Sequence, residues 1–339
     1  MRDRAEALAA ALPRERLHPA VLAWAAAAGR GRWGVAVSGG ADSLALLLLL
    51  WAHWPARRRK LLALHFNHRL RGKASGADAN FCRRVCAGLG VTLSVGAWAG
   101  RRLDASEAEA REARHGFLRA RARAIWFGHQ RDDAAETMLM RLARGSGTGG
   151  LAAPRPVQRF SDGRVHLRPL LGLRHAEIVA ALRAAGIPWR EDAGNATDRY
   201  LRNRVRNDVL PRWERAAGRD AVAGAALSRE LLEEDDAALE VWLDRWRPLD
   251  RRGRLDVRRL RGAPRAVWRR ALHRWVLRNP RAAVLSRAAF ESLLRRIETG
   301  EATRQSAGRD WFAVSDGHRL FLERASGAAR GGRPGGRAN

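Results

Sequence analysis

The sequence predicts an α/β fold, a doubly wound parallel sheet, followed by a mostly helical C-terminal domain that ends in a β-hairpin. Across the first two hundred residues, short apolar runs alternate with stretches of helical periodicity, as in consecutive βαβ units. After about residue 210 helical periodicity dominates, and an Asp-Gly pair between two apolar runs indicates a hairpin. The predicted domains are residues 1–210, residues 211–325 and a Gly/Arg-rich basic tail at 326–339, for which we expect disorder.

The predicted strands and helices position the polar segments of the chain. The strands are Gly34–Val37, Leu61–Phe66, Val91–Val95 and Ala124–Phe127, and the helices are Asp42–His53, Gly76–Leu89, Ser106–Arg121 and Asp133–Arg144. Further helical stretches are Arg215–Arg247, Pro264–Leu277 and Ser286–Glu298, and the hairpin turn is Ser315-Asp316-Gly317. Ligands of doubly wound sheets bind beyond the carboxyl ends of the strands. Three polar stretches are predicted there: Ser38–Ser43, His65–Arg71 and Gly128–Asp133.

The charge balance of the chain predicts a polyanionic partner. The 339 residues include 64 lysines and arginines against 35 acidic residues, a formal net charge of +29. Nucleic acid is the first candidate for such a partner. Only Lys60 and Lys73 are lysines, which indicates a coding bias toward arginine that explains the identity of the basic residues better than their excess. The alternative is a basic surface that serves solubility alone.

Cysteine usage and hydropathy predict a cytoplasmic protein with no membrane partner. Cys82 and Cys86 lie four residues apart on a predicted helix, which excludes a disulfide framework and a C-x-x-C pair and favours two apolar core side chains. The amino-terminal residues form no clean signal segment. The longest apolar run, Leu44–Ala52, is too short to span a bilayer.

The loop Ser38-Gly39-Gly40-Ala41-Asp42-Ser43 stands between a predicted strand and a predicted helix. Backbone N–H groups and the helix dipole favour an anion at such a turn, and Asp42 would hold a metal ion that bridges to phosphate. The spacing and the lysine of a Walker A loop are absent. The loop resembles the SGGxDS loop of the PP-loop ATP pyrophosphatases, which cleave ATP between the α- and β-phosphates. The alternative is an ordinary glycine-rich turn capped by serines.

The segment Gly128–Thr137 contains candidate catalytic groups. Asp133 and Glu136 fall on one face of a predicted helix, and His129 lies just before that helix at a strand end. Two carboxylates on one face suit an ammonium group or a second metal, whereas the alternative role is capping of the helix N-terminus. Gly145–Gly150 contains a G-x-G-x-x-G pattern, but it follows a helix, so we expect a loop there and no dinucleotide site.

Two other polar clusters suit contacts with a nucleotide or with RNA. In His65–Arg71, Asn67, His68 and Arg71 suit contacts to adenine, ribose or phosphate, and the alternative is a polar loop that closes a strand. The arginines of Tyr200–Asn207 suit RNA phosphates and base stacking, although a solvated helical face is an equal alternative.

In their order and spacing, these segments resemble the tRNA(Ile)-lysidine synthetase family over about residues 30–325. The matching blocks are SGGADS (38–43), HFNHRLR (65–71), EAEAREARH (107–115), GHQRDDAAETMLMRLARGSGTGGL (128–151), RPLL (168–171), WREDAGN (189–195) and RNRVRNDVLP (202–211). The resemblance implies a ligase that uses ATP and Mg²⁺ to adenylate O2 of the wobble cytidine of an isoleucine tRNA with a CAU anticodon. The ε-amine of free L-lysine then displaces AMP at C2, so that the tRNA reads AUA instead of AUG.

The same resemblance implies roles for individual residues and for the C-terminal part. The implied catalytic residues are Asp42, His129, Asp133 and Glu136. ATP would contact Ser38, Gly39, Gly40, Ala41, Asp42, Ser43, His68, Arg111 and Arg114, with Asp42 toward Mg²⁺. Arg202, Arg204 and Arg206 would face tRNA or brace the site. The C-terminal helices and hairpin resemble a short form of the family's tRNA-binding appendage, and the oligomeric state stays open, a homodimer included.

One segment departs from the family pattern. Between His115 and His129 about one or two helical turns are missing, yet Ser106–Arg121 still supplies the roughly dozen residues that a crossover needs. We therefore expect the fold to survive, while the placement of Arg111 and Arg114 stays open. Two alternative functions also stay open: another PP-loop enzyme, such as a tRNA thiolase or an amidotransferase synthetase, and a non-catalytic tRNA-binding relative.

Overall fold

The computed structural model describes residues 1–29, 31–67, 73–98, 107–191, 201–308 and 310–325. Contacts divide the chain into two compact units, Met1–Glu233 and the residues from Glu234 onward. The sequence placed a domain boundary at residue 210. The contacts place the division later, after Glu233, because Leu210 and Val222 pack in one apolar cluster with Met138 of the first unit. The predicted tail at 326–339 lies outside the described residues.

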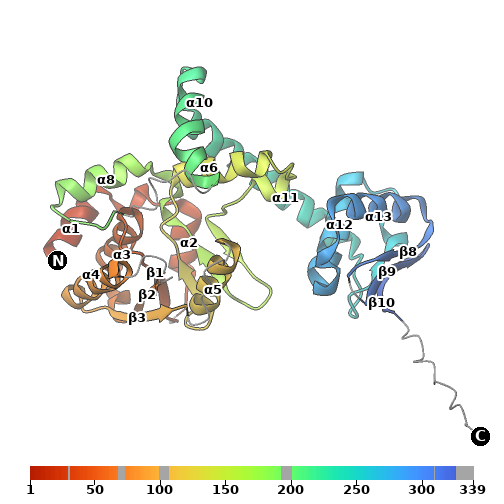
Figure 1. The fold of residues 1–339 in the computed structure, drawn as a ribbon, viewed down its shortest axis with the longest axis horizontal. Helices are drawn as coiled ribbons and strands as arrows, with labels where there is room; N and C mark the ends of the chain where they lie inside the picture. Colours follow the sequence, from red (N-terminus) through yellow and green to blue (C-terminus); the bar gives the residue numbers. More distant parts are fainter. Residues whose placement is uncertain (30, 68–72, 99–106, 192–200, 309, 326–339) are drawn as a thin grey trace, which may run out of the picture. The chain divides into compact units, whose positions relative to one another are not determined.

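The first unit is built on a six-stranded sheet with the order β3-β2-β1-β4-β6-β5, and Figure 1 labels its strands β1, β2 and β3. Its strands are β1 (Trp33–Ala36), β2 (Leu61–Asn67), β3 (Thr92–Ala97), β4 (Ala124–Trp126), β5 (Val157–Arg159) and β6 (Val165–Leu167). All neighbouring pairs are parallel except β5 and β6, which form an antiparallel pair at one edge. The predicted doubly wound parallel sheet is confirmed, and the short strands β5 and β6 are additions that the sequence did not predict.

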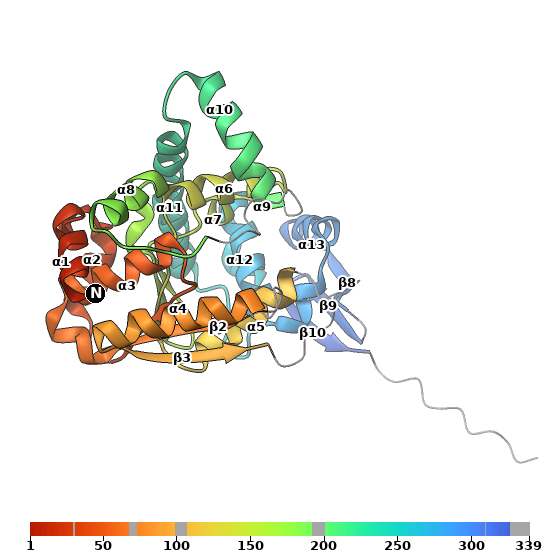
Figure 2. The same cartoon turned by 60° about the vertical axis from the view of Figure 1, so that its left-hand side comes forward.

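Helices cover both faces of this sheet, as shown by the side chains of β2, which belong alternately to two different apolar clusters. Leu61 and Ala63 join the large core under α3 (Ala41–His53) and α4 (Lys73–Leu89), whereas Leu62 and Leu64 join the cluster under α5 (Glu107–Arg119). Figure 2 shows α4 lying along β2 and β3. The large core also includes residues of α1 (Arg2–Ala11), α2 (Pro19–Ala27) and α8 (His175–Ala184). Burying opposite faces of one strand under separate helices is what makes the sheet doubly wound.

The shortened connection into β4 is accommodated by close packing. After α5 the chain reaches β4 within a few residues. A Cβ on Gly34 of β1 would lie 2.6 Å from Ala122 Cβ, and a Cβ on Gly96 of β3 would lie 2.2 Å from the Phe117 ring. Glycine at these two strand positions therefore lets α5 and the following turn sit directly on the sheet. As expected, the fold survives the deletion, since β4 pairs in parallel with β1.

Helices follow the sheet along the chain. They are α6 (Arg131–Leu142), α7 (Thr148–Leu151), α9 (Leu201–Arg204), a π-helical turn (Val205–Val209), α10 (Leu210–Ala217) and α11 (Ala221–Trp246), the last of which continues from the first unit into the second. The helical stretch predicted for Arg215–Arg247 is interrupted: α10 ends at Ala217, and Gly218, with a φ of +61°, is its left-handed C-cap before α11 begins. Gly145–Gly150, predicted as a loop, includes the start of the short helix α7.

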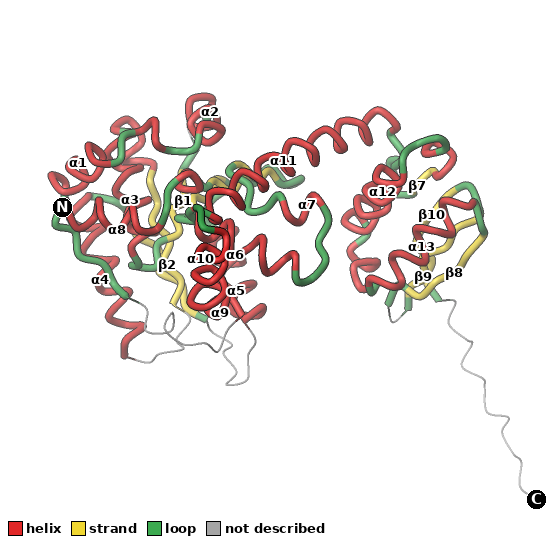
Figure 3. Tube along the Cα trace, turned by 90° about the horizontal axis from the view of Figure 1, so that it is seen from above, coloured by secondary structure: helices red, strands yellow, loops and turns green. Residues whose placement is uncertain are grey.

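The second unit packs two helices against a four-stranded antiparallel sheet (Figure 3). The helices are α12 (Arg265–Arg278) and α13 (Arg287–Thr299), and the strands, in the order β7-β10-β9-β8, are Leu255–Asp256, Arg319–Arg324, Trp311–Asp316 and Ala302–Ser306. The predicted helices and the hairpin at Ser315-Asp316-Gly317 are confirmed. The sequence missed β7 and β8. Short helical turns are Arg14–Arg16, Pro55–Lys60, Pro169–Gly172, Val257–Leu260 and Pro280–Val284. None of the helices described is long and apolar enough to cross a membrane.

Candidate active site

The loop after β1 has the geometry of an anion site. Gly39 has a φ of +97°, which favours glycine, and Gly40 is the N-cap of α3 without a side-chain cap. The Ser43 hydroxyl lies 2.9 Å from the Ser38 hydroxyl and 3.1 Å from the Ser38 backbone N–H, which donates to it. The hydrogen bonds between Ser38 and Ser43 thus fix the shape of the loop. Backbone N–H groups at the start of α3 can donate to phosphate oxygens.

Asp42 lies in the first turn of α3, half-buried beside this loop. Burial raises the pKa of the Asp42 carboxyl, and its Oδ1 lies 2.8 Å from His175 Nδ1 at the start of α8. A carboxylate that burial has desolvated is stabilised by a nearby cation. Mg²⁺ is commonly held by one or two carboxylates together with substrate phosphates, so Asp42 fits the predicted magnesium ligand. Nothing in the sequence singles out His175, because it lies 133 positions away from its partner Asp42 and outside any local motif.

The order of the strands brings the segment Gly128–Asp133 to this loop. Strand order reverses between β1 and β4, and the ends of both strands meet at that switch point. A Cβ on Gly128 would lie 2.8 Å from the Asp42 carbonyl oxygen and 2.9 Å from the Ser43 nitrogen. Glycine is required here because the two backbones touch. The sequence placed Gly128 in the motif but did not show this contact.

The start of α6 is capped by residues of the predicted catalytic segment. The Gln130 side chain accepts from the backbone N–H of Asp132 and Asp133, and Asp133 accepts in return from the Gln130 N–H. Asp132 instead accepts from Arg174 Nε and from the His175 N–H, which ties the start of α8 to α6. Asp133 therefore does cap the helix, through its Oδ2, and its Oδ1 is left to accept from other partners.

Those partners are two arginines from the segment after residue 200. Arg202 donates to Glu136 and to Asp133, each at 2.7 Å, and Arg206 donates to the same two carboxylates at 2.5 and 3.1 Å. Glu136 is fully buried. We expected these arginines either to face tRNA or to brace the site. For Arg202 and Arg206, the hydrogen bonds show the bracing role. The two carboxylates are thus matched by two guanidinium groups before any ligand binds.

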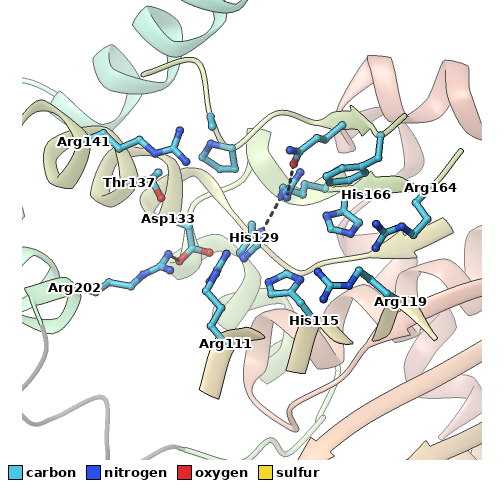
Figure 4. A pocket seen from close by; sticks show the side chains of 15 residues that line it. Arg111, His115, Arg119, His129, Asp133, Thr137, Arg141, Arg164, His166 and Arg202 are labelled. Atoms are coloured by element: carbon cyan, nitrogen blue, oxygen red, sulfur yellow. Dashed lines mark hydrogen bonds and ion pairs between the residues drawn. The ribbon is translucent and has the colours of Figure 1, made fainter. Parts of the chain in front are cut away.

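A cavity of about 310 Å³ opens beside this cluster (Figure 4). Its walls come from α5, α6, the β5–β6 edge and α9, and they include Arg111, His115, Arg119, His129, Asp133, Thr137, Arg141, Gln158, Phe160, Arg164, His166, Arg168 and Arg202. Burial and the neighbouring arginines lower the pKa of His115 to about 4 and that of His166 to about 3. Because the histidines are neutral and the arginines are charged, the lining is on balance cationic and suits an anionic ligand.

The structure brings some predicted residues together and leaves others apart. His129, Asp133 and Arg111 line one cavity. Arg114 is largely buried, and its Nε has no hydrogen-bond partner among the residues described. His68 lies outside the described residues. His115, Arg119, Arg164, His166 and Arg168 line the cavity without having been assigned a role. Of these, His115 and Arg168 stood in quoted blocks, EAEAREARH and RPLL.

A phosphate loop and a cationic cavity at the switch point of a doubly wound sheet define a nucleotide-binding α/β protein. A family model described as the PP-loop domain matches residues 14–213. Because this match covers more than half of the 339 residues, the chain belongs to the PP-loop family of ATP-binding domains. The resemblance of the SGGADS loop to PP-loop enzymes is thereby confirmed.

Curated relatives share one function. The chain is similar to the tRNA(Ile)-lysidine synthases of Symbiobacterium thermophilum (42% identity, 60% of this chain, 44% of the relative) and Aromatoleum aromaticum (45%, 56% and 45%). It is also similar to that of Xanthomonas campestris (37%, 80% and 63%). The chain thus spans between 44% and 63% of the length of these relatives.

A solved structure is also similar to this chain. The U34-tRNA thiolase NcsA from Methanococcus maripaludis, with its [4Fe-4S] cluster, matches with a TM-score of 0.50 at 17% identity. The match covers 68% of this chain and 78% of the thiolase. At that identity the likeness supports the fold alone.

Proposed function

We propose that this protein is a tRNA(Ile)-lysidine synthase. The observation that carries the proposal is the contact of Gly128 with the PP-loop backbone, which places the loop beside the segment that supplies His129 and Asp133 to the arginine-rich cavity. Similarity to curated lysidine synthases over more than half of the chain supports the same function. The net charge of +29 suits a tRNA partner.

In the proposed reaction, the loop Ser38–Ser43 binds the phosphates of ATP, and Mg²⁺ held by Asp42 would neutralise phosphate charge. O2 of the wobble cytidine forms a bond to the α-phosphorus, and pyrophosphate leaves. The ε-ammonium group of L-lysine loses a proton to solvent, and the amine nitrogen then bonds to C2 with its lone pair. AMP departs with the electrons of the C2–O bond, and the nitrogen loses a second proton to solvent. The arginines of the cavity would offset the negative charge on the phosphates in both steps.

The acidic residues have a more specific role than binding lysine directly. Asp133 and Glu136 already accept hydrogen bonds from Arg202 and Arg206. An incoming ammonium group would share these carboxylates with the arginines or displace one of them. We therefore assign Asp133 and Glu136 the task of fixing the guanidinium groups of Arg202, at the cavity wall, and of Arg206 beside it. Asp133, which lines the cavity, would receive lysine on its remaining lone pairs.

The thiolase alternative is less compatible with the thiols of this chain. Cys82 and Cys86 are both buried in the core under α4. Burial raises the pKa of the Cys82 thiol to about 12 and that of Cys86 to about 11. A nucleophilic or cluster-binding cysteine requires an accessible thiolate, so these two behave as core side chains.

The test is the incorporation of labelled lysine into an isoleucine tRNA transcript with a CAU anticodon, in the presence of ATP and Mg²⁺. A methionine tRNA with the same anticodon is the substrate control. We expect lysine in the isoleucine tRNA only, and loss of this activity in Asp42→Asn but not in Asp3→Asn, which alters an exposed carboxylate on α1. Tight tRNA binding without lysine incorporation would favour the non-catalytic relative, and ATP-dependent thiolation would favour a thiolase.

A further inference from the structure

The hydrogen bond between Arg168 and His129 has a defined direction. Arg168 Nε lies 3.0 Å from His129 Nδ1 (Figure 4, dashed line to His129). A guanidinium group has N–H donors and no acceptor. Nδ1 must therefore supply a lone pair, and the proton of a neutral His129 ring resides on Nε2.

Both partners of this bond are fixed in place. Arg168 is buried, and its other nitrogens donate to the Arg155 carbonyl at 2.7 Å and to Gln158 Oε1 at 3.2 Å. The His129 ring stacks on Phe127 with an interplanar angle of 9° and a centroid distance of 5.5 Å. Neither side chain can turn to exchange the roles of the two ring nitrogens without losing these contacts.

The doubly protonated ring is disfavoured as well. Burial is the largest cause that lowers the pKa of His129 well below its ordinary value, followed by the charges of Arg168, Arg202, Arg114 and Arg111. These groups reach the ring from the residue after β6, from α9 and from α5. At neutral pH the histidine is consequently a neutral ring.

We propose that Arg168 is a positioning residue that holds His129 as its Nε2–H tautomer, so that His129 serves as a hydrogen-bond donor and not as a proton acceptor. With its one lone pair occupied by Arg168, the ring presents an N–H to the bound substrate. The acceptor of that N–H would be an oxygen of the phosphate or of the adenylated cytidine. This role rests on the proposed function, but the tautomer itself does not.

The tautomer is measured directly in the free protein. Two-bond ¹H–¹⁵N spectra of histidine-labelled full-length protein distinguish Nε2–H from Nδ1–H rings, and His129 is assigned from the signals lost in His129→Gln. We expect an Nε2–H pattern at pH 7 and a mixed or inverted pattern in Arg168→Met. Arg164→Met, which removes a cavity arginine that pairs with Asp162, should leave the His129 pattern unchanged. An Nδ1–H or doubly protonated ring in the wild type overturns the proposal, and so does an unchanged pattern in Arg168→Met.

Activity provides the second readout. A Gln amide can place an N–H near the position of Nε2, so we expect His129→Gln to keep lysine incorporation within about 10-fold of the wild type, whereas His129→Leu should lose about 10²–10³-fold, as for removal of a transition-state donor. Equal losses in the two variants would instead indicate a general base. If the wild type incorporates no lysine, the proposed function fails, while the NMR result still decides the tautomer. If Arg168→Met does not fold, the wild-type spectrum and Arg168→Lys supply the test.

Discussion

The contact between Gly128 and the phosphate loop predicts a sharp effect of a single methyl group. In Gly128→Ala, the new Cβ would lie 2.8 Å from the Asp42 carbonyl oxygen and 2.9 Å from the Ser43 nitrogen, whereas ordinary contact begins at 3.4 Å. The opposing atoms are backbone, so the segment after β4 and the start of α3 must separate by about 0.6 Å to relieve the overlap. Overpacking of this kind costs about 1–3 kcal/mol, partly offset by about 0.4–1 kcal/mol from the lower entropy of the unfolded chain.

The same separation displaces the phosphate loop from His129. Because a misplacement of about 1 Å can cost about 10²-fold in rate, we expect Gly128→Ala to lower ATP-dependent pyrophosphate release about 10-fold. Urea unfolding should show a net loss of about 1–2 kcal/mol. The matched control is Gly224→Ala in α11, where a Cβ meets nothing within 4 Å and where alanine should stabilise the helix by up to about 1 kcal/mol. Unchanged stability together with unchanged pyrophosphate release in Gly128→Ala would refute the steric reasoning.

Three further predictions follow from the charges of the site. Glu136→Gln removes the fully buried charge that pairs with Arg202 and Arg206 and leaves Asp133 as their remaining carboxylate partner in this cluster. Since both arginines are partly exposed, we expect the low end of the buried-pair cost, about 3 kcal/mol in urea unfolding; a change below about 0.5 kcal/mol would contradict the bracing role. The pKa of His166 is lowered from 6.5 to about 3 in the folded chain. Between pH 6.5 and pH 3 the unfolded chain therefore binds a proton that the folded chain does not, so the free energy of unfolding falls as the pH falls. His166→Phe should therefore reduce the loss of stability between pH 8 and pH 5 by about 2 kcal/mol, measured by unfolding at both pH values, and an unaltered pH dependence would argue against a neutral buried ring. Finally, tRNA binding should weaken about 10²-fold or more between 50 and 200 mM salt in a filter-binding assay, whereas affinity independent of salt would exclude phosphate contacts as its main source.

The order of elements and the phosphate loop could be predicted from local sequence. Apolar runs such as Leu44–Leu50 and the glycines of Ser38–Ser43 act on their immediate neighbours, so their effect on strand, turn and helix is visible in a short window. Strands β5, β6 and β7 escaped prediction because two or three residues carry no periodicity, and β8 escaped because its sequence Ala302–Ser306 has no apolar alternation. The end of α10 escaped because the Gly218 C-cap was overlooked within a helical pattern.

The pairings that define the site were decided by tertiary structure. Local sequence placed Asp133 and Glu136 on one helix face, but it did not show that Arg202 and Arg206, about seventy positions later, would neutralise them. Arg168 reaches His129 and His175 reaches Asp42 only because β6 lies beside β4 and α8 begins near α3. Charge partners, ring tautomers and the cavity depend on which distant segments the topology brings together. The sequence by itself therefore determined the class of fold and the kind of ligand, and the packing of the sheet and its helices determined which side chains can act on that ligand.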